Sequence, residues 1–252
     1  MSARVGSSRG SLIALGTLGV VGELFITVGV LLLAFLVWQL WWTDVEGNRA
    51  QTEIVQHLGW DPAPTASPAA GSTAPTVVIA PPRRDAPPVV AEPKHATTFA
   101  TFQVPRWDGE PARPVSEGVD KATILDVLGI GHYPGTAMPG DVGNFAIAAH
   151  RTTYAKPFNR VAELVAGDPI VVRTQDTWYV YRVTTTEIVA PSQVRVIAPV
   201  PDDPGATPTQ RMITLTTCHP MFSAKQRYVV HGVLDYWAPV ADGVPAELVG
   251  GS

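Results

Sequence analysis

The sequence predicts a mainly β domain, a barrel or a sandwich, that follows one membrane-spanning helix and a proline-rich linker. Three observations support this prediction. An apolar run lies near the N-terminus. The chain has 24 prolines, and many of them fall between Trp60 and Pro93. After these, short runs rich in Val, Ile, Thr and aromatic residues alternate with turn residues. The chain therefore divides into an anchor, a linker and one folded domain of moderate size.

The apolar run, residues 24–42, reads LFITVGVLLLAFLVWQLWW and is interrupted by a single polar residue, Gln39. About 19 residues at 1.5 Å each reach roughly 28 Å, which is enough to cross the hydrocarbon core of a membrane. A cleaved signal peptide is the alternative, but the run is long and continues into WWTDVE without a small-x-small cleavage site. We therefore expect a retained transmembrane helix.

Charges on the two sides of this run predict its orientation. Arg4 and Arg9 precede it, whereas Asp44 and other acidic residues follow it. Because positive charge favours the cytoplasmic side, residues 1–23 are expected to form a short cytoplasmic tail with a membrane-proximal apolar segment. The bulk of the chain would then lie outside a cell membrane that it crosses once.

Residues 43–97 are expected to form a juxtamembrane segment and a linker. A weak apolar stripe in residues 43–58 could continue the helix for a few turns. The segment Asp61–Ala96 is rich in Pro, Ala, Ser and Thr, and it has too little apolar surface to offset the entropy lost on ordering. We expect an extended spacer that holds the folded domain away from the bilayer.

Residues 98–240 are expected to form the folded domain, and residues 241–252 a C-terminal tail. A short helix is predicted at PFNRVAEL, residues 157–164, from the Pro at its first turn and its apolar spacing. Seven or eight short strands imply a barrel or a sandwich. The predicted strands are TFATFQVP, ATILDVLGI, NFAIAAH, PIVVRT, TWYVYRVTTTEIV, RMITLTTC and RYVVHGVLDYW.

Composition excludes several classes of protein. The chain has 18 Lys and Arg against 22 Asp and Glu, without a basic stripe, which argues against a nucleic-acid partner. Its one cysteine excludes an internal disulfide framework and the multi-cysteine zinc sites. That cysteine is therefore either a buried small side chain or a reactive thiol.

Three strand ends carry residues suited to covalent acyl transfer. His150 ends NFAIAAH, Cys218 ends RMITLTTC, and Arg227 begins the last predicted strand. Strand ends in a barrel meet at one rim, so the three side chains could share a groove. A cysteine attacks a carbonyl as the thiolate, a histidine moves the proton, and an arginine can hydrogen-bond the oxyanion.

With TLTTC, a downstream Arg and an upstream AHR after PGTAMPGDVGN, the domain resembles the sortases, cysteine transpeptidases that attach proteins to the envelope of Gram-positive bacteria. The resemblance implies an eight-stranded β-barrel with one or two short helices and no cofactor or metal. It also implies that Cys218 is the nucleophile, that His150 is the acid and base, and that Arg227 orients the substrate and stabilises the oxyanion. Thr216 and Thr217 would then lie in the substrate-binding groove.

GHYPGTAMPGDVGN followed by HRTTYAKPF is most similar to class E sortases of actinobacteria. That class is associated with LAxTG sorting signals in place of LPxTG, and with a Tyr in the loop before the His-bearing strand. Tyr133 matches that position, and its hydroxyl could donate to the peptide backbone near position two. One departure is Ala149, where Gly is more usual before the His; an added methyl group is tolerated unless φ is positive.

The resemblance also implies the partners. The enzyme would cleave a C-terminal sorting signal of a secreted protein between Thr and Gly, through a thioacyl intermediate. It would then transfer that protein to an amine, such as a peptidoglycan precursor or a pilin lysine. Membrane lipid would surround the anchor.

Other interpretations remain open at this stage. A noncatalytic β domain would make the combination of Cys, His and Arg accidental. A papain-like hydrolase fits the order of these residues poorly, and an L,D-transpeptidase would carry a Gly-Cys pair in a compact His/Arg motif, which TTCHP is not. His132, His219 and His231 are interpreted as local or structural residues. Asp202 and Asp203 could hold calcium, although adjacent carboxylates are more often solvated.

Overall fold

The computed structural model describes residues 9–66 and 76–249 of the chain. The start of the predicted cytoplasmic tail, residues 67–75 of the predicted linker and the last three residues of the predicted C-terminal tail lie outside the described residues. The chain separates into two compact units, Met1–Thr43 and Asp44–Ser252.

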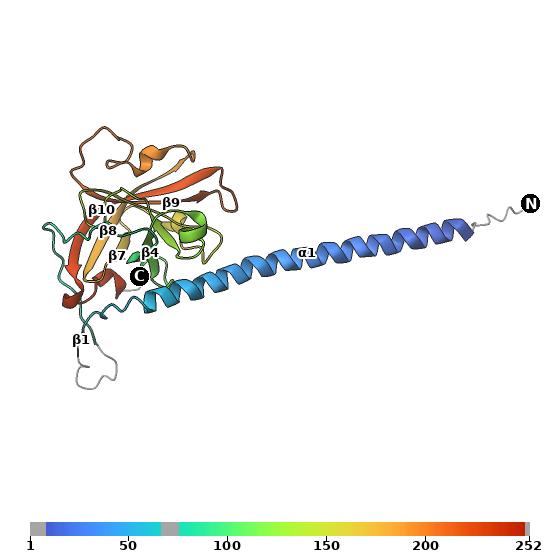
Figure 1. The fold of residues 1–252 in the computed structure, drawn as a ribbon, viewed down its shortest axis with the longest axis horizontal. Helices are drawn as coiled ribbons and strands as arrows, with labels where there is room; N and C mark the ends of the chain where they lie inside the picture. Colours follow the sequence, from blue (N-terminus) through green and yellow to red (C-terminus); the bar gives the residue numbers. More distant parts are fainter. Residues whose placement is uncertain (1–8, 67–75, 250–252) are drawn as a thin grey trace, which may run out of the picture. The chain divides into compact units, whose positions relative to one another are not determined.

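The first long element is the helix α1, Arg9–Gln56, drawn in blue in Figure 1. It contains the apolar run 24–42 and the extension that the weak apolar stripe predicts. Residues Leu18–Gln56 are long and apolar enough to cross a membrane, and the apolar window within them is not buried by other parts of the chain. The prediction of one long apolar helix is therefore confirmed.

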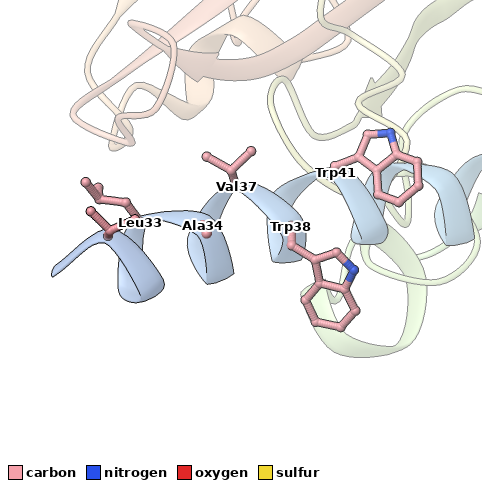
Figure 2. Close-up of a pocket in the computed structure, with 6 residues that line it drawn as sticks. Leu33, Ala34, Val37, Trp38 and Trp41 are labelled. Atoms are coloured by element: carbon pink, nitrogen blue, oxygen red, sulfur yellow. The ribbon is translucent and has the colours of Figure 1, made fainter. Parts of the chain in front are cut away.

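Large side chains leave a shallow hollow along one stretch of α1. Figure 2 shows Leu33, Val37 and Trp41, which follow one another at intervals of about one helical turn. Trp38, on the same stretch, is 52% exposed. The hollow is lined almost entirely by apolar side chains, so it is not a candidate active site.

Eight strands form a closed barrel in the order β10-β8-β7-β3-β4-β5-β6-β9, which confirms the predicted eight-stranded barrel (Figure 1). Closure pairs every strand on both sides and leaves no open sheet edge. The strands are β3 (Thr98–Gln103), β4 (Arg113–Glu117), β5 (Ile130–His132), β6 (Gly143–Ala148), β7 (Pro169–Arg173), β8 (Thr177–Val189), β9 (Arg211–His219) and β10 (Gln226–Pro239).

The connections contain only short helical turns. The predicted helix at 157–164 is reduced to a single 3₁₀ turn, η2 (Val161–Glu163). A π-helical turn, η1 (Lys121–Leu125), joins β4 to β5. The other 3₁₀ turns are η3 (Val194–Ile197), η4 (Val240–Asp242) and η5 (Ala246–Leu248).

The barrel core follows from the two-residue alternation of its strands. On β8, Tyr179 and Tyr181 point into the main core and are fully buried, whereas Trp178 and Val180 pack in a second cluster on the other face. Side chains on the outer face of a barrel strand are buried only when another segment of the chain covers that face. The second cluster is covered by Ala63 and other residues outside the barrel strands.

One strand prediction is wrong, and one strand was not predicted. ATILDVLGI, residues 122–130, is expected to be a strand, but its first part lies in η1 and a turn, and only its last residue, Ile130, enters β5. A short apolar run with this spacing suits either structure, and here Ile124 is buried as part of a turn. Conversely, RPVSE forms the buried strand β4. Its Pro, Arg and Glu are not typical of a buried strand, so the composition does not predict it.

The expected free spacer is not found in its second half, because residues 76–96 dock on the barrel. Arg83 and Trp237 exchange backbone hydrogen bonds of 2.8 and 2.9 Å, and the Trp237 indole donates to the carbonyl of Asp85. The hydroxyl of Tyr179 donates to the Pro88 carbonyl at 2.6 Å. Backbone and ring groups of the barrel thus supply partners that composition alone does not predict. The short strand β1 (Thr65–Ala66), earlier in the predicted linker, pairs with β2 (Thr76–Val77) at the start of this segment.

The end of α1 packs against the barrel as well, within the unit Asp44–Ser252. Gln51 is 1% exposed, donates to the Tyr154 carbonyl at 3.2 Å and accepts from Arg113 at 3.2 Å. Lys156 forms an ion pair of 2.7 Å with Asp44. The last turns of α1 therefore support the loop that follows β6.

Candidate active site

Three neighbouring strands carry the thiol, imidazole and guanidinium groups that the sequence singles out. β6 runs parallel to β9 with Ala148 opposite Thr216, and His150 and Cys218 each follow two residues later. β10 runs antiparallel to β9 and places Arg227 opposite Cys218. Barrel topology thus brings three residues that are distant in sequence to the ends of adjacent strands.

A groove of about 670 Å³ opens beside these strand ends. Val119, Leu125 and Phe222 give it apolar walls, and the Phe222 side chain is largely exposed at its rim. A groove of this size is in the range that binds small ligands and short peptides. Its lining includes every residue predicted for the site: Tyr133, His150, Thr216, Thr217, Cys218 and Arg227.

The two threonines before Cys218 fasten β9 to β6. The Thr217 hydroxyl donates to the carbonyl of Ala149 at 2.7 Å, and the Thr216 hydroxyl donates to the carbonyl of Ile147 at 3.3 Å. Both residues are buried. These hydrogen bonds between β9 and β6 set the position of Cys218 relative to His150. The two threonines line the groove with their remaining atoms.

His150 has a carboxylate partner that sequence reasoning missed. Its Nε2 lies 2.6 Å from Oδ1 of Asp126, and the two side chains are 16% and 18% exposed. Asp126 follows η1 directly, in the segment that was predicted to be a strand. The ring of Tyr154 lies 5.2 Å from the imidazole, centroid to centroid. The imidazole is thus held between a carboxylate and an aromatic ring.

Cys218 is a half-buried free thiol whose backbone is held by a second unpredicted residue, Arg151. The Arg151 guanidinium donates to the Cys218 carbonyl at 3.3 Å and to Nδ1 of His219 at 2.8 Å. It also lies over the ring of Tyr228. A guanidinium only donates hydrogen bonds, so Nδ1 of His219 is the acceptor here. His219 therefore helps to hold Arg151 against the backbone of Cys218. The interpretation of His219 as a local or structural residue agrees with this contact.

Arg227 lies along the groove with its side chain directed to its own loop. Its Nη1 donates to the carbonyls of Ala224 and Gln226, each at 3.0 Å. These are exposed hydrogen bonds, which exchange readily with water or a ligand. Arg227 is therefore opposite Cys218 in register and lines the same groove, while its guanidinium is bonded to its own loop.

Tyr133 is fixed at the floor of the groove by a chain of hydroxyl groups. Its phenol lies 3.0 Å from the hydroxyl of Thr216. Both contacts of Thr216 are satisfied together when the Tyr133 phenol donates to Thr216 and Thr216 donates to the Ile147 carbonyl. In that arrangement the Tyr133 oxygen keeps a lone pair that can accept from a peptide N–H. The expectation that Tyr133 contacts the peptide backbone near position two stays a prediction.

Buried polar groups behind Tyr133 hold its loop. His132 is fully buried, and its Nδ1 lies 2.6 Å from the carboxyl of Glu117. Burial raises the pKa of Glu117, and the hydrogen bond to His132 opposes part of that rise. The Thr136 hydroxyl donates to the Tyr133 carbonyl at 2.8 Å, and Glu92 of the docked segment accepts the Gly135 N–H at 3.0 Å.

One other cluster could in principle hold a metal. Donor atoms of Glu187, Asp202 and His231 lie within 4.8 Å of one another. The Arg195 guanidinium, however, forms ion pairs with both carboxylates and already supplies a positive charge there. His231 is buried and bonded to Thr214, in line with a structural role. The set includes Asp202 but does not extend to Asp203.

A family model for the sortase domain matches residues 102–235. Sortase SrtE1 of Streptomyces coelicolor is 36% identical over 235 residues, and the match covers 91% of this chain. This chain spans 60% of the length of that relative.

Two solved structures share the barrel. The SrtA sortase from Actinomyces oris is 43% identical with a TM-score of 0.64, and the alignment covers 68% of this chain and 97% of that chain. The crystal structure of sortase E1 from Streptomyces coelicolor, which holds a tripeptide in its active site, is 40% identical with a TM-score of 0.56. That alignment covers 60% of this chain and 96% of the other.

Proposed function

The chain belongs to the sortase family, and on that premise we propose that it is a membrane-anchored class E transpeptidase that cleaves a C-terminal LAxTG- or LPxTG-type sorting signal between Thr and Gly. The observation that carries the proposal is the meeting of Cys218, His150 and Arg227 along one groove. A thiol, a proton carrier and an oxyanion donor are the three groups that acyl transfer through a thioester requires.

In the first step the thiolate of Cys218 attacks the carbonyl carbon of the signal's Thr. A C–S bond forms, and the charge on the oxygen of the tetrahedral intermediate is met by the guanidinium of Arg227 after it leaves its loop carbonyls. The Thr–Gly C–N bond then breaks. The leaving Gly amine takes its proton from the imidazolium of His150.

In the second step an acceptor amine attacks the thioester. The now neutral imidazole of His150 takes a proton from the attacking nitrogen, a new amide bond forms, and the C–S bond breaks to restore the thiolate. Neither step needs a cofactor or a metal. The acceptor is an amine of the cell envelope, such as a peptidoglycan precursor or a pilin lysine.

The anchor and its orientation belong to the proposal. Residues 24–42 of α1 cross the cell membrane, with the N-terminus in the cytoplasm and the barrel outside. The length of the apolar helix and the positive charge before it support this arrangement. The partners are then secreted proteins that carry the sorting signal, because these emerge on the same side as the groove.

The test is a panel of variants assayed on a fluorogenic LAxTG peptide with an added amine. Cys218→Ala and His150→Ala should fall below detection, with thermal unfolding close to that of the parent because Cys218 is only half buried. Arg227→Lys should lose about 10²-fold or more, because a point charge does not reproduce the planar donor fork. Mass spectrometry of the parent should trap a thioester on Cys218. Full activity of Cys218→Ala would contradict the proposed function.

A further inference from the structure

Asp126 makes the closest polar contact of the proposed base. Its carboxylate lies 2.6 Å from Nε2 of His150, and both side chains are less than one fifth exposed. We propose that Asp126 is the positioning residue of this enzyme: it fixes the ring orientation and tautomer of His150 so that Nδ1 faces the reaction. The inference rests on the proposed function in that it names the residue which holds its acid and base.

The chemistry of the contact selects the tautomer. An ionised carboxylate only accepts hydrogen bonds, so the nitrogen that faces it carries the proton. Neutral His150 then has Nε2–H directed to Asp126 and a lone pair on Nδ1. After Nδ1 takes a proton, the carboxylate also compensates the positive charge of the imidazolium. The reacting nitrogen is therefore Nδ1, which Asp126 does not contact.

Asp126 is itself held in place. Its backbone N–H donates to the Lys121 carbonyl at 2.8 Å, and Leu128 N–H donates to the Ile124 carbonyl at 2.6 Å. Ile124 is fully buried and anchors the turn. A carboxylate on such a turn presents a fixed acceptor, whereas one on a free loop would follow the histidine. This rigidity is what a positioning role requires.

A different reading of the same contact is a latch that holds His150 away from Cys218. The two readings predict opposite effects of removing the carboxylate. Positioning predicts a slower chemical step, whereas a latch predicts a faster one. Asp126→Asn separates them with little change in shape, and Asp126→Glu keeps a carboxylate.

The experiment uses the full chain in detergent and the LAxTG peptide assay. Asp126→Asn should lower kcat by about 10- to 100-fold, part of the roughly 10²–10⁴ that general acid–base catalysis supplies, with KM little changed. Asp126→Glu should recover part of that loss. Asp120→Asn is the matched control, because Asp120 precedes the same turn and its side chain is 66% exposed. Unchanged or raised kcat in Asp126→Asn overturns the inference.

A second measurement is independent of activity. With ¹⁵N-labelled histidine, two-bond ¹H–¹⁵N spectra distinguish Nδ1–H from Nε2–H, and the His150 signals are assigned by their loss in His150→Gln. Neutral His150 should be the Nε2–H tautomer in the parent and should become a mixture in Asp126→Asn. An unchanged tautomer contradicts the role of Asp126. If the parent cleaves no peptide, the proposed function fails while this spectrum still decides the inference.

Discussion

At the scale of single residues, the hydroxyl of Tyr133 belongs to a chain of hydrogen bonds at the groove. The chain is fully satisfied when Tyr133 donates to Thr216 and Thr216 donates to the Ile147 carbonyl. The oxygen of Tyr133 is left as an acceptor at the floor of the groove. A peptide N–H is its natural donor, and proline has none. This chain of hydrogen bonds gives a physical reason to prefer Ala over Pro at position two of the signal.

We therefore predict that the parent enzyme has a higher kcat/KM for LAxTG than for LPxTG peptides, and that Tyr133→Phe reduces the ratio. Loss of one hydrogen bond of about 0.5–1.5 kcal/mol corresponds to roughly a 2- to 12-fold change. Steady-state kinetics with the two peptides measure the ratio. Tyr228→Phe is the control, because Tyr228 packs against Arg151 instead. An LPxTG preference in the parent would remove the class E assignment.

Asp126 and Arg151 show a second point at this scale. Each acts through a neighbour: Asp126 through the ring of His150, and Arg151 through the backbone of Cys218. Neither residue type stands out in a sequence that has 22 acidic and 18 basic residues. The reactive groups are visible in sequence because they are rare, whereas their supports are common residues in unremarkable loops.

At the scale of elements, the end of α1 is part of the catalytic unit. Gln51 is buried between the carbonyl of Tyr154 and the guanidinium of Arg113, and Gly129 packs directly against its side chain. A side chain on Gly129 would collide with it, since an added Cβ would lie 2.8 Å from the Gln51 amide carbon. One helix residue thus braces the loop after β6 and the turn before β5 together.

We predict that Gln51→Ala destabilises the barrel by about 1–3 kcal/mol, because it leaves buried hydrogen-bonding groups without a partner. Urea unfolding of the full chain, followed by the near-ultraviolet circular dichroism of the aromatic core, measures the change. Gln56→Ala is the matched control, because Gln56 is an exposed glutamine at the end of the same helix. Equal stabilities of the two variants would show that the docking of α1 contributes nothing.

At the scale of the whole molecule, the chain combines an apolar helix with a folded unit that begins at Asp44. The folded unit includes the end of α1 and the docked segment 76–96 besides the barrel.

For this arrangement we predict the topology in cells. A tag placed before Arg4 should be protected from external protease, whereas a tag after Ser252 should be removed, because the positive charge precedes the apolar run. Immunoblots of intact and permeabilised cells give the comparison, and permeabilised cells should lose both tags. Removal of the N-terminal tag from intact cells would reverse the orientation.

The sequence by itself determined the class of fold and the family. The apolar run, the alternating strands and the motif around Cys218 are local patterns. Local patterns can be recognised in the sequence without knowledge of the fold. The same patterns pointed to His150 and Arg227, because strand ends in a barrel meet at one rim. All of these residues do line one groove.

Only the tertiary structure decided what surrounds them. Asp126 lies 24 positions before His150, in a run whose apolar spacing fits a strand as well as a turn. Residues 76–96 have the composition of a spacer, and they are ordered because the barrel offers backbone and ring partners to them. Composition indicates only how much apolar surface a segment can bury by itself. Contacts between distant segments add stabilisation that no window of sequence contains, and these contacts set the position of the imidazole and the support of its loop.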